Sequence, residues 1–189
     1  MKIAVKFLLT AFVMLSLLSC KDDNKSAATA EEPAGIDEIS KNQGQAFIKD
    51  DESQPNVLDI AMQSDDHTTL VAAVQAADLE NALVNAGPLM VFAPTNEAFD
   101  QLPEGTVENL LKPENKDQLA NILKYHVTPG NYDKEFLKKF KKLGQANNEY
   151  VEVTVEGDDV YVGGAKIIAS VPAGNGIVHV VDKVILPKN

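Results

Sequence analysis

The most informative pattern of apolar and polar positions lies near the middle of the chain, where the apolar run 89–93 stands between two prolines. The run is too short for a helix and does not alternate with polar residues, so it predicts a strand that is buried on both faces. Pro94 ends the run, and Thr95 or Asn96 then offers a side-chain oxygen that can cap a short helix. We expect a strand, a sharp turn and a helix here, with Phe99 folded back onto the core.

Apolar residues at helical spacing predict three short helices before this strand. The first starts near residue 56, the second follows Asp66, and the third follows Asp78, which can cap it. Gly87 and Pro88 stop the third helix. The apolar residues with helical spacing are Val57, Ile60, Ala61, Leu70, Val71, Val74, Leu79, Leu83 and Ala86.

Further helices are expected after the strand. Residues 102–106 predict a loop that ends in a helix cap, and one or two helical turns follow. Asn115 and Gln118 have the spacing of a capping box, and the helix that they start should end at 129–130. Its apolar stripe is Leu119, Ile122, Leu123 and His126. Because His126 lies on this stripe, its side chain is expected to point inward.

Residues 134–142 predict a short amphipathic stretch with Phe136, Leu137 and Phe140 inward. Five lysines face outward, namely Lys134, Lys138, Lys139, Lys141 and Lys142. One interpretation of this cluster is a solvated helix face. The functional hypothesis is that it contacts anionic lipid head groups or an acidic polysaccharide, with binding that salt would weaken.

The last third of the chain changes to the period of two that is typical of strands. Valines alternate with polar residues over 151–156, a turn follows, and 160–162 starts a return strand. A further strand is expected around 166–168, and 177–186 is expected to be the longest. Helices first and strands afterwards predict an α+β fold with an antiparallel or mixed sheet.

The N-terminal residues predict export and a lipid anchor. Residues 1–19 have two lysines followed by an apolar run that is typical of a signal peptide, and Cys20 follows a leucine, another leucine and a serine. This pattern resembles the bacterial lipoprotein box, which implies cleavage before Cys20 and acylation of that residue. Residues 20–55 then predict a flexible acidic tether. A short docking helix is the alternative for its apolar residues, which are Ile36, Ile39, Phe47 and Ile48.

The charge balance excludes one class of partner. The formal net charge is −11, and loss of Lys2 and Lys6 with the signal peptide would make it about −13. All basic residues are lysines. Binding of nucleic acid is therefore disfavoured, because it needs a basic surface and commonly uses arginine for base contacts.

Three segments resemble the fasciclin domains of extracellular adhesion proteins. Residues 88–99 are similar to the first signature motif of that family, 124–130 to its tyrosine–histidine motif, and 175–187 to its second signature motif. The matching residues are Phe92, Ala93, Pro94, Thr95, Asn96, Phe99, Tyr125, His126 and His179. The resemblance implies a wedge-shaped sheet with flanking helices over residues 56–189. It also implies receptor contact around the tyrosine–histidine pair and, more weakly, around Asp182. The competing interpretation of the pair is structural, with His126 locking the helix onto the sheet and only the Tyr125 side able to face a partner.

Residues that could carry catalysis or bind metal are few. We find no nucleophile elbow, no phosphate-binding glycine loop and no paired zinc histidines, so neither a cofactor nor a metal is expected. His126 and His179 are interpreted as hydrogen-bonded core residues, whereas His67 is expected to be exposed near a helix start. Acidic pairs fit turns and caps better than a calcium site.

These observations favour a noncatalytic adhesion or interaction module, anchored as an outer-membrane lipoprotein that faces the cell surface or the periplasm. Its partners would be the membrane, through the lipid anchor, and an unknown protein or glycan. The alternative is an envelope protein that binds a glycan or a small molecule in a pocket between helices and sheet. An enzyme would require a cleft that holds His126 beside a carboxylate.

Overall fold

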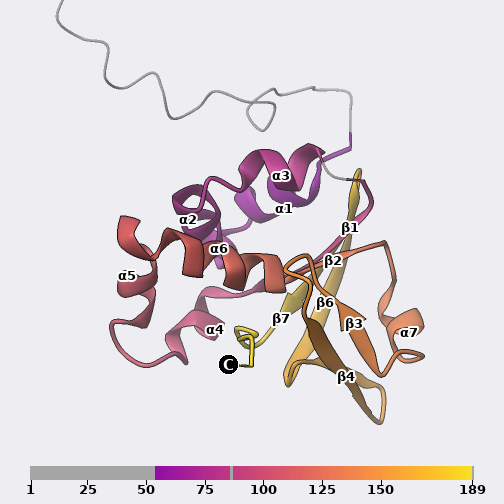
Figure 1. The fold of residues 1–189 in the computed structure, drawn as a ribbon. Helices are drawn as coiled ribbons and strands as arrows, with labels where there is room; N and C mark the ends of the chain where they lie inside the picture. Colours follow the sequence, from indigo (N-terminus) through magenta and orange to yellow (C-terminus); the bar gives the residue numbers. More distant parts are fainter. Residues whose placement is uncertain (1–53, 86, 189) are drawn as a thin grey trace, which may run out of the picture. The chain divides into compact units, whose positions relative to one another are not determined.

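The structure is a computed structural model that describes residues 54–85 and 87–188 (Figure 1). Its strands are β1 (Leu89–Pro94), β2 (Val127–Pro129), β3 (Lys142–Gly144), β4 (Tyr150–Glu156), β5 (Asp159–Val162), β6 (Ala165–Ala173) and β7 (Gly176–Val181). Its helices are α1 (Val57–Met62), η2 (Asp65–His67), α2 (Thr68–Ala76), α3 (Glu80–Asn85), α4 (Asn96–Asp100), α5 (Thr106–Leu110), η3 (Pro113–Asn115), α6 (Lys116–Tyr125) and α7 (Lys134–Leu137). The signal peptide, Cys20, nearly all of the tether and Ala86 lie outside the described residues.

The strands form one mixed sheet in the order β2-β1-β7-β6-β5-β4-β3. β1 and β7 are parallel, with Phe92 opposite His179, and the other neighbouring pairs are antiparallel. Two of the three family motifs therefore lie side by side, as the second and third strands of the sheet. The α+β class with a mixed sheet and flanking helices is confirmed.

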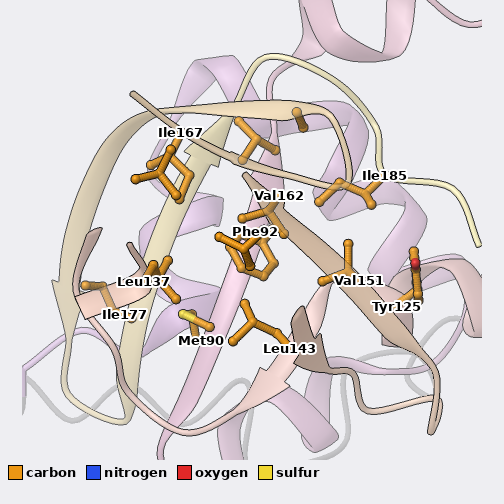
Figure 2. Packing of buried hydrophobic residues seen from close by; sticks show 14 residues of the cluster. Met90, Phe92, Tyr125, Leu137, Leu143, Val151, Val162, Ile167, Ile177 and Ile185 are labelled. Atoms are coloured by element: carbon orange, nitrogen blue, oxygen red, sulfur yellow. The ribbon is translucent and has the colours of Figure 1, made fainter. Parts of the chain in front are cut away.

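β1 separates two apolar clusters because every residue of this strand is buried, as its unbroken apolar run predicts. Met90 and Phe92 enter the cluster that Figure 2 shows, in which Phe92 lies near the middle. Leu89, Val91 and Ala93 point to the opposite face and pack against helices. Figure 1 shows α1, α2, α3 and α6 gathered beside this second face.

We name the two clusters by the elements that supply them. The sheet cluster is Met90, Phe92, Tyr125, Leu137, Leu143, Val151, Val153, Val160, Val162, Ala165, Ile167, Ile177, Val181 and Ile185. The helical cluster is Val57, Leu58, Leu70, Ala73, Val74, Ala77, Leu89, Val91, Ala93, Leu119, Leu123 and Val178. β1 contributes to both clusters, and so does β7.

The parallel pairing of β1 with β7 depends on a glycine. Gly176 lies opposite Leu89 at the start of β7. A Cβ atom built on Gly176 would overlap the carbonyl oxygen of Leu89, so the absence of a side chain is required for the two backbones to approach.

Several predicted element ends are wrong. α6 ends at Tyr125, because the chain already enters β2 two residues later and pairs with β1. β7 ends at Val181, and residues 182–188 contain no strand, so β6 is the longest strand. These differences arise because pairing partners, which a single segment does not reveal, decide where a strand begins and ends.

Two predicted caps are also wrong. α5 begins after Gly105, which has a φ of 77° and makes no side-chain cap, so Thr106 is the first helical residue. Asn115 precedes α6 without capping it, because its side-chain amide donates to the carbonyl oxygen of Asn109. In the lysine-rich stretch, Leu137 is fully buried as expected, but the Phe136 side chain is 41% exposed.

Candidate functional site

The tyrosine–histidine pair lies at the end of α6, and both of its side chains are buried. Tyr125 is 3% exposed, and its hydroxyl donates to the carbonyl oxygen of Tyr150 at 3.1 Å. In His126, Nδ1 lies 2.9 Å from the carbonyl oxygen of Ile122, and Nε2 accepts from the backbone N–H of Ile185 at 3.0 Å. The pair therefore joins α6 to β4 and to the C-terminal segment. His126 points inward as predicted, and the burial of Tyr125 favours the structural interpretation of the pair over contact of Tyr125 with a partner.

His126 is held in the neutral form. Burial lowers the pKa of its imidazole to about 4, and the hydrogen bond to the carbonyl oxygen of Ile122 offsets only part of that effect. A carbonyl oxygen accepts and a backbone N–H donates, so the proton lies on Nδ1. No carboxylate among the described residues influences this pKa. The arrangement is that of a structural histidine, without the acidic neighbour that an enzyme interpretation required.

His179 is a second structural histidine, as predicted. Its side chain is fully buried and lies on the Phe92 ring, with 5.8 Å between the ring centroids. Nδ1 lies 2.8 Å from the hydroxyl of Ser170, and Nε2 lies 2.9 Å from the carbonyl oxygen of Tyr132. Burial lowers the pKa of His179, so the neutral ring receives the hydroxyl proton at Nδ1 and donates from Nε2.

The expectation that His67 is exposed is wrong. Its side chain is 6% exposed, and Nδ1 lies 2.8 Å from the hydroxyl of Ser64. The residue does lie next to a helix start, as the sequence indicates, but η2 turns the ring toward β1 and not toward solvent. Burial lowers the pKa of His67. All three histidines of the chain are therefore buried and unable to meet a partner at the surface.

The turn after β1 holds two elements together. Thr95 caps α4, because its hydroxyl oxygen accepts from a backbone N–H in the first turn. Asn96 acts on a different helix: its Oδ1 accepts from the backbone N–H of Thr69 at 3.0 Å, and its Nδ2 donates to the carbonyl oxygen of Asp65 at 2.9 Å. Phe99 packs partly buried against the helical cluster, as predicted. This motif fixes the backbone of the domain.

Asp182 also makes internal contacts. Its carboxylate accepts from the backbone N–H of Lys166 at 2.7 Å, and its carbonyl oxygen accepts from the side-chain amide of Gln101 at 3.0 Å. These bonds tie the end of β7 to the start of β6 and to the end of α4. The carboxylate is thus used to join elements of the fold.

The lysine cluster divides into paired and unpaired members. Lys134 lies 3.9 Å from Asp159, and Lys138 pairs with Glu135 at 2.8 Å. Three lysines form no ion pair with the described residues and are exposed: Lys139, Lys141 and Lys142. The cationic surface is therefore narrower than the sequence pattern predicts.

Exposed aromatic rings accompany these free lysines. The Nζ atom of Lys139 lies 4.7 Å from the centroid of the Phe136 ring, and that of Lys142 lies 4.6 Å from the centroid of Tyr150. Phe136 is 41% exposed and Tyr150 is 65% exposed. These residues come from α7, from the segment after it and from the starts of β3 and β4, and we refer to Phe136, Lys139, Lys141, Lys142 and Tyr150 as the lysine–aromatic surface. Exposed aromatic side chains of this kind are enriched where proteins contact partners.

An apolar cavity of about 240 Å³ lies within the helical cluster. Residues of α1, α2, α3 and β1 line it, together with the end of α6. Lys124 and His126 are its polar lining residues, and both ring nitrogens of His126 are bonded elsewhere. The cavity reaches the surface, because its lining residues Ala82, Lys124 and Ala146 are exposed.

The described residues contain neither a metal-binding group of side chains nor a membrane-spanning helix. Within residues 54–85 and 87–188, histidine, cysteine and acidic side chains do not come together in groups of three or more that could hold a metal ion. Among the described helices, none combines the length and apolar character needed to span a bilayer.

Comparison with known proteins identifies the family. The family model described as a fasciclin domain matches residues 65–187, which is more than half of the chain. The chain belongs to the fasciclin domain family. Protein sll1483 of Synechocystis sp. is 47% identical over 137 residues, covering 72% of this chain and 76% of that protein.

Other fasciclin relatives are longer proteins. Transforming growth factor-beta-induced protein ig-h3 of Sus scrofa is 36% identical over 132 residues, covering 69% of this chain and 19% of that protein. Among solved structures, a FAS1 domain pair from the insect cell adhesion molecule Fasciclin I aligns with a TM-score of 0.42 and 21% identity, over 68% of this chain and 43% of that one. This chain therefore spans only part of the length of these two proteins.

Two features of the fasciclin domain were missed from its sequence. Asn175 lies in the segment that resembles the second signature motif, but its contacts are not evident from the sequence: its Oδ1 accepts from the backbone N–H of Val57 and its Nδ2 donates to the carbonyl oxygen of Leu83. It thus fastens α1 and α3 to the turn before β7. The apolar cavity lies between helices and sheet, where the alternative function places a pocket, but its lining residues and volume were not predicted, because the apolar residues that line it also predict a filled core.

Proposed function

We propose that this fasciclin domain is a noncatalytic adhesion or interaction module, carried by an outer-membrane lipoprotein at the cell surface or facing the periplasm. Family membership supports it, because the resemblance to the fasciclin domains of extracellular adhesion proteins implies such a module. The burial of all three histidines also supports it, because these are the side chains best suited to acid–base chemistry near neutral pH. Contact with a partner then depends on the outer surface of the domain.

The lysine–aromatic surface carries the proposal. It combines three exposed lysines with two exposed rings on a chain whose net charge is −11. Long-range repulsion would keep acidic molecules away from most of such a protein, so a local cationic patch directs them to one place. We therefore propose that the partner is acidic, either a polysaccharide or a protein, and that rings and charges act together.

Binding to a polyanion tests this assignment. The soluble protein should be retained on immobilised alginate more strongly than on neutral dextran, and added salt should weaken the retention. Replacement of Lys139, Lys141 and Lys142 by glutamine should abolish the difference. Replacement of three other exposed lysines, Lys112, Lys183 and Lys188, changes the net charge equally and should leave retention nearly unchanged.

The two triple variants decide whether the lysine–aromatic surface binds the polyanion. Equal loss of retention in both triple variants would mean that net charge alone acts, and the lysine–aromatic surface would lose its role. Unchanged retention in the patch variant would remove it as well. A chain that prefers an acidic protein over alginate, with the same dependence on the three patch lysines, would support the surface and identify its partner as protein.

Lipid anchoring is a separate part of the proposal and rests on Cys20. Growth with labelled palmitate should label the intact protein, and Cys20→Ala should prevent labelling and release the protein from membranes. Digestion of intact cells with a proteinase then distinguishes the two faces of the outer membrane: loss of the domain indicates surface display, and protection indicates the periplasm. Labelling of the alanine variant would contradict the anchor.

The apolar cavity favours a second candidate function, which is binding of a small molecule. Glycans are poor candidates for this cavity, because their hydroxyls would lose hydrogen bonds to water without replacement. The apolar residues that line the cavity favour an apolar ligand. Stabilisation of the folded protein by an apolar small molecule, absent when the cavity is filled by a larger side chain, would support this function.

A further inference from the structure

The cavity in the helical cluster is large for a natural domain core. Protein interiors are close-packed, and voids much larger than a water molecule are few. An engineered apolar cavity of about 150 Å³ remains dry and binds benzene. The cavity described above has a volume of about 240 Å³ and nearly all of its lining residues are apolar. It therefore has room for an apolar group larger than benzene.

The walls determine which ligands are excluded. Leu70, Val74 and Leu83 present only carbon atoms, and both ring nitrogens of His126 are already bonded to the backbone. A polar ligand would lose its hydrogen bonds to water in this space. The inner part of the ligand must accordingly be a hydrocarbon.

The rim supplies one charged group. Lys124 lines the cavity in the last turn of α6 and is exposed. Its ammonium group makes no hydrogen bond or ion pair with any described residue. A lysine in this place can meet an anion while the rest of the ligand lies inside, since the ammonium is a flexible point charge.

We propose that this cavity binds one medium-chain carboxylate, with the alkyl chain among α1, α2, α3 and β1 and the carboxylate at Lys124. The inference rests on the second candidate function and is independent of the lysine–aromatic surface. The positive charge of Lys124 excludes a cationic amphiphile. A neutral alcohol would make the apolar contacts with the cavity walls but would lack the attraction between a carboxylate and the ammonium group.

Calorimetric titration of the full chain, below the critical micelle concentration of each probe, tests the ligand class. Decanoate should bind once per chain. From hexanoate to decanoate, affinity should rise about fourfold for each methylene that enters the cavity, and it should level off for longer chains. Decyltrimethylammonium should bind much more weakly than decanoate.

Two pairs of variants locate the binding. Val71→Trp places a large side chain in the cavity and should abolish binding, whereas Ala72→Trp alters the exposed neighbour on the same helix and should not. Lys124→Gln should weaken decanoate about two- to fivefold and leave decanol unchanged. Lys112→Gln removes an exposed lysine elsewhere and should leave both unchanged.

The outcomes distinguish a failure of the carboxylate assignment from a failure of small-molecule binding as such. Decanol binding that Val71→Trp blocks, without binding of decanoate, would overturn the carboxylate assignment and leave small-molecule binding intact. Absence of binding by both probes would overturn the ligand and the second candidate function together. Decanoate binding that survives Val71→Trp in a folded variant would place the ligand elsewhere and overturn the site.

Discussion

The two apolar clusters on either side of β1 differ in how completely they are filled. In the sheet cluster, Phe92, Leu137, Val160 and Val162 are fully buried, and Figure 2 shows side chains from several strands meeting around Phe92. In the helical cluster, short helices meet β1 and leave a cavity of about 240 Å³. One strand thus supports a filled core on one face and a hollow core on the other.

The difference follows from the elements that form each cluster. Strands joined by ladder hydrogen bonds hold their side chains at fixed spacing, so opposing side chains can interdigitate closely. The helices α1 and α3 each have six residues, and such short helices depend on tertiary contacts for their stability. Side-chain amides bond to the backbone of these helices and of α2: Asn56 to α1, Asn96 to α2 and Asn175 to α3. The sheet cluster is thus built from paired strands, and the helical cluster holds the cavity in which we propose that a ligand binds.

The largest expected effect comes from removing the same side chain on each face. Leu137→Ala should lower the free energy of unfolding by about 4 kcal/mol, because Leu137 is fully surrounded. Leu70→Ala should lower it by only about 2 kcal/mol, because Leu70 already borders a cavity and has fewer neighbours to lose. Urea unfolding of both variants measures the difference. Equal losses would contradict the distinction between the clusters.

A change of pH tests His126, which bonds to Ile185 of the sheet cluster and also lines the cavity of the helical cluster. His126 has a folded pKa of about 4 and a model unfolded pKa of 6.5. Above pH 6.5 both states are neutral. As the pH falls from 6.5 to 4, only the unfolded chain gains the proton, so the free energy of unfolding falls by about 3 kcal/mol from this residue.

Two variants isolate this contribution in denaturant unfolding at pH 7 and pH 4. The stability advantage of the parent over His126→Gln should shrink by about 3 kcal/mol between these pH values. Tyr125→Phe serves as the control, because it removes one hydrogen bond and should cost about 1 kcal/mol at both. An advantage of constant size over His126→Gln would show that the imidazole is not buried in its neutral form.

The smallest expected effects come from adding one methylene group to each cluster. Val74→Ile should raise the free energy of unfolding by about 1 kcal/mol, because the new group enters the cavity. Val162→Ile should lower it by about 1 kcal/mol or more, because Val162 is fully buried within the sheet cluster and the added group would overpack it. Thermal unfolding measures both. Destabilisation by both variants would indicate that the helical cluster is as tightly packed as the sheet cluster.

The sequence predicted best what local patterns determine. The apolar run of β1 and the valine alternation of β4 gave the right elements, because burial on two faces or one face fixes the periodicity. The family motifs also gave the right class of fold. The ends of α6 and β7 were wrong because pairing with distant strands decides them, and β2 with its three residues is too short to recognise.

The candidate site could be predicted only in part. The inward position of His126 followed from the helical stripe, but the burial of Tyr125 depends on β4, which lies far along the chain. The exposure of His67 was predicted wrongly, because a position next to a helix start does not reveal which side of η2 faces β1. The residues that line the cavity could not be identified from the sequence, because an apolar residue beside an empty space is the same in sequence as one packed against another side chain.

Crystals of the protein under xenon pressure offer the most direct test of the contrast between the two clusters, since xenon enters dry apolar cavities. Xenon should appear in the helical cluster, beside Leu70, Val74 and Leu83, and should be absent from the sheet cluster around Val160 and Val162. Xenon at both places, or at neither, would contradict the contrast between a filled and a hollow core.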